Sequence, residues 1–146
     1  MKRIIIDATK CSGCKNCAAA CMKAHAPEGV EFSLSDPQFE SRNVILKDSK
    51  NKSKPLFCRH CDKPSCVYSC MSGAMTKDSV SGVVLYNKDK CASCFMCVMN
   101  CPFGVLKPDR VTKSYVIKCD FCLNAGGEPN CVKKCPVKTI YVREGI

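Results

Sequence analysis

Sixteen of the 146 residues are cysteine, and all sixteen fall into four groups of four closely spaced thiols. Groups one and three have the spacing C-x2-C-x2-C-x3-C, whereas group two has C-x2-C-x4-C-x3-C and group four has C-x2-C-x8-C-x3-C. The groups are Cys11, Cys14, Cys17 and Cys21; Cys58, Cys61, Cys66 and Cys70; Cys91, Cys94, Cys97 and Cys101; and Cys119, Cys122, Cys131 and Cys135. This repeated spacing predicts metal sites, because the cysteine thiolate is a metal ligand.

The spacing of groups one and three indicates iron–sulfur clusters. C-x2-C-x2-C-x3-C is the bacterial ferredoxin pattern, in which three cysteines bind one [4Fe–4S] cluster and the fourth binds a different cluster. Sixteen thiolates, at four per cluster, complete the ligand sets of four clusters, so no iron is left open for a substrate. The chain also lacks a phosphate-binding loop and a nucleophile–base pattern. The sequence therefore predicts an electron carrier and not an enzyme.

Disulfides and zinc are the two other uses of so many cysteines. A disulfide framework is typical of small secreted proteins, but the segment 1–7 has only three apolar residues before an acid and does not resemble a secretory signal. Zinc ribbons join two C-x2-C pairs and do not need three cysteines at x2 spacing. A zinc-structured binding module is the alternative from a different class, and its colourless metal would distinguish it.

The formal net charge of +10 overstates the basicity of the working protein. Each oxidised cluster with its four thiolates carries a net charge of about −2, so four clusters bring the total to about +2. The charge therefore predicts no nucleic-acid partner. No run of residues approaches the roughly 20 apolar residues of a membrane span. We expect a cytoplasmic protein without a direct membrane span.

An internal repeat divides the four groups into two types. The segments 4–11 and 83–91 each have a short β-rich run, a polar turn, a lysine and then the first ligand. Groups two and four share a proline directly before a short predicted helix, at Pro64 and Pro129. Two pairings of unlike groups remain open: one with two and three with four, or one with four and two with three. A predicted hairpin of residues 74–77 and 83–86, turning at 81–82, favours the second pairing.

The order and spacing of the four groups resemble those of the four-cluster ferredoxin-like electron-transfer subunits that accompany molybdopterin enzymes, hydrogenases, formate dehydrogenases and CO dehydrogenases. The resemblance covers about residues 4–142 and implies the nested pairing, one with four and two with three. The implied ligands are Cys11, Cys14, Cys17 and Cys135 for cluster A; Cys21, Cys119, Cys122 and Cys131 for cluster B; Cys58, Cys61, Cys66 and Cys101 for cluster C; and Cys70, Cys91, Cys94 and Cys97 for cluster D. Met22 and Met71 stand where the ferredoxin pattern has proline after the fourth cysteine, which would alter the helix exit there.

Group two, with its sequence CRHC and the segment 70–75, resembles the iron–sulfur proteins associated with CO dehydrogenase (CooF-like). This resemblance implies a nickel CO dehydrogenase as the catalytic partner and a flavin NAD(P) oxidoreductase or a hydrogenase as the acceptor. The alternative is an electron-transfer subunit of a formate dehydrogenase, hydrogenase or molybdopterin oxidoreductase.

The expected fold is α+β and ferredoxin-like, with two fused bacterial dicluster ferredoxin units made of short helices and β-hairpins. We expect a single four-cluster domain over 1–146, with unit one at about 1–30 plus 111–146 and unit two at about 55–110. An inserted loop is expected at about 22–57, with a strand at 44–46 and a basic loop at 47–54. That loop is either a solvated surface or a docking site for a partner.

Five basic residues near the ligands carry further expectations. Lys10, Lys90 and Lys118 each precede the first cysteine of a group, where a cation would favour the reduced cluster unless the lysine is only solvated at a turn. His25 is expected to have a surface or structural role. His60 lies between two ligands and either donates to a cluster sulfur or is structural.

Overall fold

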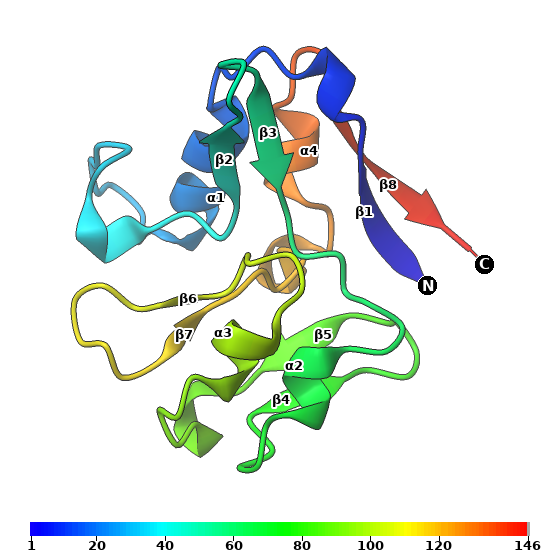
Figure 1. Ribbon diagram of the computed structural model, residues 1–146. Helices are drawn as coiled ribbons and strands as arrows, with labels where there is room; N and C mark the ends of the chain where they lie inside the picture. Colours follow the sequence, from blue (N-terminus) through cyan, green and yellow to red (C-terminus); the bar gives the residue numbers. More distant parts are fainter. Residues whose placement is uncertain (146) are drawn as a thin grey trace.

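The computed structural model describes residues 1–145, and its secondary structure confirms the expected α+β class (Figure 1). The strands are β1 (Lys2–Ile6), β2 (Val44–Lys47), β3 (Ser53–Leu56), β4 (Met75–Lys77), β5 (Val84–Tyr86), β6 (Lys107–Pro108), β7 (Val116–Ile117) and β8 (Ile140–Glu144). The α-helices are α1 (Asn16–His25), α2 (Ser65–Tyr68), α3 (Met96–Asn100) and α4 (Asn130–Lys133). Short 3-10 turns are η1 (Ala8–Lys10), η2 (Pro37–Phe39), η3 (Lys88–Lys90) and η4 (Leu123–Ala125). No helix within residues 1–145 is both long and apolar enough to cross a membrane.

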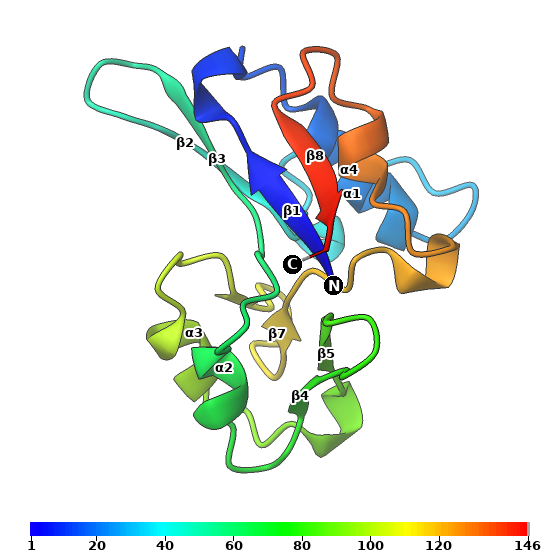
Figure 2. The same ribbon diagram turned by 90° about the vertical axis from the view of Figure 1, so that its right-hand side faces the viewer.

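The two ends of the chain meet in one half of the molecule (Figures 1 and 2). Strand β1 pairs with β8 in antiparallel register, from Lys2 opposite Glu144 to Ile6 opposite Ile140. Helix α1 lies against α4, and the β2–β3 hairpin covers the same half. Groups one and four, which are remote in sequence, therefore share this half of the fold.

The middle of the chain forms the other half, which lies below the first in both views. Strands β4 and β5 form the predicted hairpin, and Gly82 in its turn has a φ of +74°, which glycine adopts without strain. Helix α2 lies against α3, so groups two and three share this half. The buried Val116 of β7 belongs to the same core. This half therefore continues through β7, past the expected boundary at residue 110.

The predicted repeat has the same local structure in both halves. β1 leads into η1, where the Asp7 side chain accepts a hydrogen bond from the Thr9 backbone at 3.3 Å. β5 leads into η3, where Asn87 accepts from the Asp89 backbone at 2.9 Å. These caps end each strand and place the first cysteine of groups one and three at the same point of the turn.

The segment expected as an inserted loop, at about 22–57, has regular structure at both ends. Helix α1 continues past Cys21 to His25, because Met22 stands where a proline would end the helix. The predicted strand at 44–46 is present as β2, and it pairs with β3. Asp48 closes the turn between them by accepting hydrogen bonds from the Lys50 and Lys52 backbones at 2.9 Å. The basic loop at 47–54 is therefore the tip of a hairpin.

Two small hydrophobic cores lie in the two halves, and cysteines contribute to both. Ile4, Phe57, Phe121 and Ile140 are among the buried residues of the first core. The second core includes Met75, Val105, Leu106 and Val116. Apolar side chains thus pack against cysteines of all four groups.

Candidate iron–sulfur sites

Groups one and four are brought together in two cavities. The first cavity is lined by four thiols, those of Cys11, Cys14, Cys17 and Cys135, together with apolar side chains such as Phe57. The second cavity is lined by a second set of four, namely Cys21, Cys119, Cys122 and Cys131. These two sets are the ones that the sequence resemblance implies for clusters A and B. In each set, one group supplies three cysteines and the opposite group supplies the fourth.

Groups two and three come together in the same way where α2 packs on α3. Burial raises the pKa of Cys66 to about 11, Lys118 opposes this rise, and the neighbouring thiols of Cys58, Cys101 and Cys61 add to it. The four cysteines implied for cluster C are therefore mutual neighbours.

The remaining four thiols are neighbours as well. Burial raises the pKa of Cys97, the Val98 backbone N–H lowers it, and the thiols of Cys70, Cys91 and Cys94 raise it further. These are the cysteines implied for cluster D. The cysteines of groups one and four, and those of groups two and three, are thus neighbours within their own halves, as the nested pairing requires.

The loops that carry the thiols share an uncommon backbone conformation. In each group the residue before the second cysteine has a left-handed φ: +75° at Gly13, +46° at His60, +57° at Ser93 and +62° at Phe121. This turn directs backbone N–H groups at cysteine sulfur atoms. The Ser93 N–H donates to the Cys91 Sγ, and the Phe121 N–H donates to the Cys119 Sγ, both at 3.4 Å. Such N–H groups stabilise thiolate charge. Only Gly13 could have signalled the conformation in the sequence, because glycine alone adopts it freely.

The insertion supplies two contacts to helix α1 that the sequence did not indicate. The Arg42 backbone N–H donates to the Cys21 sulfur at 3.3 Å. The buried Asn43 side chain donates to the Cys17 carbonyl oxygen at 3.2 Å. The chain that follows the 26–41 segment therefore returns to brace the two helical cysteines of group one.

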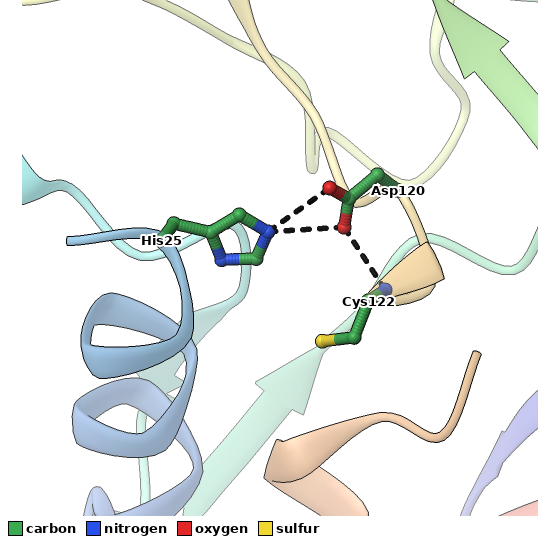
Figure 3. A group of neighbouring side chains, drawn as sticks. All are labelled: His25, Asp120 and Cys122. Atoms are coloured by element: carbon green, nitrogen blue, oxygen red, sulfur yellow. Dashed lines mark hydrogen bonds and ion pairs between the residues drawn. The ribbon is translucent and has the colours of Figure 1, made fainter. Parts of the chain in front are cut away.

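His25, Asp120 and Cys122 form a cluster beside the second cavity (Figure 3). The His25 Nε2 donates to both Asp120 carboxylate oxygens at 3.0 and 3.1 Å, and its Nδ1 donates to the Cys21 carbonyl oxygen at 2.8 Å. The Cys122 backbone N–H also donates to Asp120, at 3.0 Å. Burial opposes a charged imidazole, but the Asp120 carboxylate outweighs it and raises the pKa of His25 to about 9. The Asp120 carboxylate is thus already hydrogen-bonded to His25 and to the Cys122 backbone. His25 therefore has the expected structural role, because it joins α1 to the group-four loop.

His60 is buried between the two halves of the molecule. Its Nδ1 accepts a hydrogen bond from the Val84 backbone at 2.9 Å, which leaves the proton on Nε2. Burial, followed by the nearby Lys118 charge, lowers the pKa of His60 to about 3, so the ring is neutral. Within residues 1–145 the buried Nε2 has no hydrogen-bond partner. A sulfur of a cluster held by the flanking Cys58 and Cys61 is a chemically suitable acceptor.

The three lysines that precede cysteine groups differ in their surroundings. Lys10 and Lys90 are exposed, and Lys10 forms an ion pair with Asp7 at 3.3 Å. Lys118 is buried, with only 5% of its surface exposed. The same sequence position therefore gives two solvated lysines and one internal cation.

The chemistry of the donor sets fits [4Fe–4S] clusters. Burial raises the pKa of Cys17 to about 11, and the neighbouring Cys135, Cys14 and Cys11 thiols raise it further. Four such thiols cannot ionise together without a compensating cation, and the cationic core of an iron–sulfur cluster supplies it. Tetrahedral sets of four cysteines are the usual ligands of these clusters.

The fold and the thiol sets define an iron–sulfur electron-transfer protein. Within that class, residues 49–145 match the 4Fe-4S dicluster domain family, and this chain therefore belongs to that family. Its sixteen cysteines are enough for four clusters. The resemblance to cluster-carrying electron-transfer subunits is thereby confirmed, and the zinc module is not supported.

Several curated proteins of Escherichia coli K12 are similar along most of the chain. Protein NrfC is 38% identical over 94% of this chain, which spans 62% of NrfC. The protein named "Putative electron transport protein YsaA" is 33% identical over 94% of this chain and 86% of its own length. The B subunit of the anaerobic dimethyl sulfoxide reductase is 34% identical over 92% of this chain and 69% of its own length. The relatives thus include a subunit of an oxidoreductase complex.

A solved structure has a similar fold. The active site complex BamBC of benzoyl coenzyme A reductase matches 98% of this chain and 79% of its own chain, with a TM-score of 0.54 and 26% identity. This likeness again relates the protein to oxidoreductase complexes.

Proposed function

We propose that this protein relays single electrons through four [4Fe–4S] clusters between the catalytic subunit of an oxidoreductase and a second redox partner. The observation that carries the proposal is the meeting of cysteines from groups one and four in two thiol-lined cavities. Neighbouring thiols of groups two and three in the other half support it. The chain supplies ligands, hydrogen bonds to sulfur and an apolar surround. The clusters supply the one-electron chemistry.

The proposed ligand sets are the four that the sequence resemblance implies. They are Cys11, Cys14, Cys17 and Cys135 for cluster A; Cys21, Cys119, Cys122 and Cys131 for cluster B; Cys58, Cys61, Cys66 and Cys101 for cluster C; and Cys70, Cys91, Cys94 and Cys97 for cluster D. The two thiol-lined cavities support sets A and B. Sets C and D are supported because their thiols are close enough to raise the pKa of Cys66 and of Cys97.

We infer that the clusters are ordered A, B, C, D along the molecule. The loops of groups two and four meet in the middle, where the ring of His60 packs edge-on against Phe121 with centroids 5.5 Å apart. The two rings occupy the same position in their loops, directly before the second cysteine. The Cys58 thiol also lies close enough to Cys119 to raise the pKa of that thiol, which links the proposed set C to the proposed set B. Sets B and C are therefore the inner pair.

The outer clusters are the proposed points of exchange with partners. Among the sixteen cysteines only Cys14 and Cys94 are exposed, and they belong to the proposed sets A and D. Electrons would thus enter through one exposed end and leave through the other. Beside set A, a groove lined by Cys11, Lys52 and Lys54 runs along the tip of the β2–β3 hairpin. We propose the basic 47–54 tip as part of a docking surface for an acidic partner surface.

The proposed partners follow from the local resemblance of group two. A nickel CO dehydrogenase would donate electrons, and a flavin NAD(P) oxidoreductase or a hydrogenase would accept them. The alternative is the electron-transfer subunit of a formate dehydrogenase, hydrogenase or molybdopterin oxidoreductase, and the similarity to the B subunit of dimethyl sulfoxide reductase favours a reductase of this kind. We propose a cytoplasmic location, because sixteen reduced thiols favour a reducing compartment.

The decisive experiment measures iron, acid-labile sulfide and zinc per chain in protein purified without oxygen. About sixteen iron and sixteen sulfide per chain are expected for four cubane clusters. Mixing the loaded protein with each candidate catalytic subunit and its substrate then tests the partner, with bleaching of the cluster absorbance as the readout. About four zinc with little iron would overturn the proposal.

A further inference from the structure

Lys118 bridges the two halves of the molecule from a buried position. Its ammonium group donates to the Val84 carbonyl oxygen of β5 at 2.5 Å and to the Cys119 carbonyl oxygen at 2.7 Å. Val84 belongs to the half with groups two and three, whereas Cys119 opens group four. The lysine side chain therefore lies at the junction of the two halves.

The Lys118 charge has no carboxylate partner among the ion pairs within residues 1–145. Nearby groups do not replace one: Asp120 is bound to His25 at 3.0 Å, and the His60 Nδ1 accepts the Val84 N–H, as a neutral ring does. By contrast, Lys77 lies 3.8 Å from the Asp62 carboxylate. A buried charge without a counter-ion is costly, so buried charges are normally paired. The thiolates are the remaining anions that can offset Lys118.

Lys118 lies beside residues of both inner sets. Its ammonium group contacts the carbonyl oxygen of Cys119, a proposed ligand of cluster B. It also contacts the carbonyl oxygen of Val84, whose backbone N–H donates to His60 between the proposed cluster C ligands Cys58 and Cys61. The field of one buried cation thus reaches both inner clusters. Lys10 and Lys90, which precede the groups of the outer clusters, are exposed and screened by solvent.

We propose that Lys118 is a fixed internal cation that raises the reduction potentials of the two inner clusters above those they would otherwise have. The inference rests on the proposed function and its ligand sets. One-electron reduction takes a cluster with its four thiolates from a charge of −2 to −3, with no bond or proton change, and the partner enzyme supplies the electron. A cation in a dry junction stabilises the added charge. Electrons that enter at one end are thereby drawn through the middle of the molecule.

The test compares three variants of the loaded protein by reductive titration followed by electron paramagnetic resonance. Lys118→Gln keeps a hydrogen-bond donor but removes the charge. It should lower the reduction potentials of two of the four clusters. At a given solution potential, the reduced-to-oxidised ratio of each should fall at least tenfold, which corresponds to 59 mV for a one-electron couple. Lys118→Arg keeps the charge and should shift these two reduction potentials far less. Lys90→Gln is the matched control at the equivalent exposed position, and it should shift none.

The outcomes separate this inference from the proposed function. Wild-type protein without about sixteen iron per chain would refute the function itself. A loaded Lys118→Gln protein with four unchanged steps, or equal shifts in the Arg and Gln variants, would overturn the role of the charge. If both Lys118 variants fail to load while Lys90→Gln loads fully, the lysine is only a structural tether between the two carbonyl groups, and the proposal is wrong.

Discussion

Gly13, in the first ligand loop, offers a direct test of how the backbone shapes a cluster site. It lies between Cys11 and Cys14 and has a φ of +75°. A Cβ at this position would clash with the Ser53 Oγ and would lie 3.2 Å from the Ser53 Cβ. Gly13→Ala therefore imposes both a left-handed alanine and a steric conflict with β3.

The cost can be worked out from these two terms. A left-handed conformation costs an ordinary residue about 1–2 kcal/mol. The Ser53 Oγ can rotate away about χ1, whereas the contact at 3.2 Å remains, so the steric term is at the low end of the overpacking range, about 1 kcal/mol. The total of about 2–3 kcal/mol corresponds to a drop in Tm of roughly 4–12 °C for a chain of this size.

The assay is the Tm of the loaded protein under anaerobic conditions, together with iron per chain. We expect Gly13→Ala to lose about four iron, one cluster, before the others, because its strain falls on the loop of proposed cluster A. Adding Ser53→Gly should recover the steric part and leave the backbone part. Gly29→Ala is the matched control, since Gly29 has a φ of +79° with open space around it and lies outside the cysteine groups.

A Gly13→Ala protein with sixteen iron and the wild-type Tm would refute this reasoning. So would a Gly29→Ala protein that loses iron to the same extent. Either result would mean that the left-handed turn before the second cysteine is not what shapes the ligand loop.

Three further predictions concern the brace, the clusters and the proposed docking loop. Asp120→Asn removes the ion-pair partner of the buried His25 and should destabilise the loaded protein by about 1–3 kcal/mol, read as a lower Tm, whereas the exposed Asp89→Asn should have no effect. Anaerobic removal of iron by a chelator should unfold both halves, because the proposed clusters join remote segments; a native circular dichroism spectrum after iron loss would contradict this. Reversal of the lysine charges in the 47–54 loop should slow electron transfer from the catalytic partner by at least tenfold at low salt, and an unchanged rate would exclude docking there.

The chemistry of the protein was readable from the sequence alone, because ligand spacing is a local property. Three cysteines at x2 intervals can wrap one cluster whatever the rest of the chain does, so the class of protein and the number of clusters follow from sixteen residues. The β4–β5 hairpin was predictable for the same reason, since its strands and turn are adjacent in sequence. The β1–η1 and β5–η3 repeat was readable from short matching segments.

Tertiary packing, by contrast, settles which groups share a site and which polar residues are buried. The packing of α1 on α4 joins segments that are more than 100 residues apart, as Cys11 and Cys135 are, and spacing left two pairings open. Lys10, Lys90 and Lys118 occupy the same local position, yet only Lys118 is buried, because only its turn lies where the two halves meet. The His25–Asp120 brace likewise depends on two segments meeting in space. Burial and charge environment are long-range properties, and local sequence does not contain them.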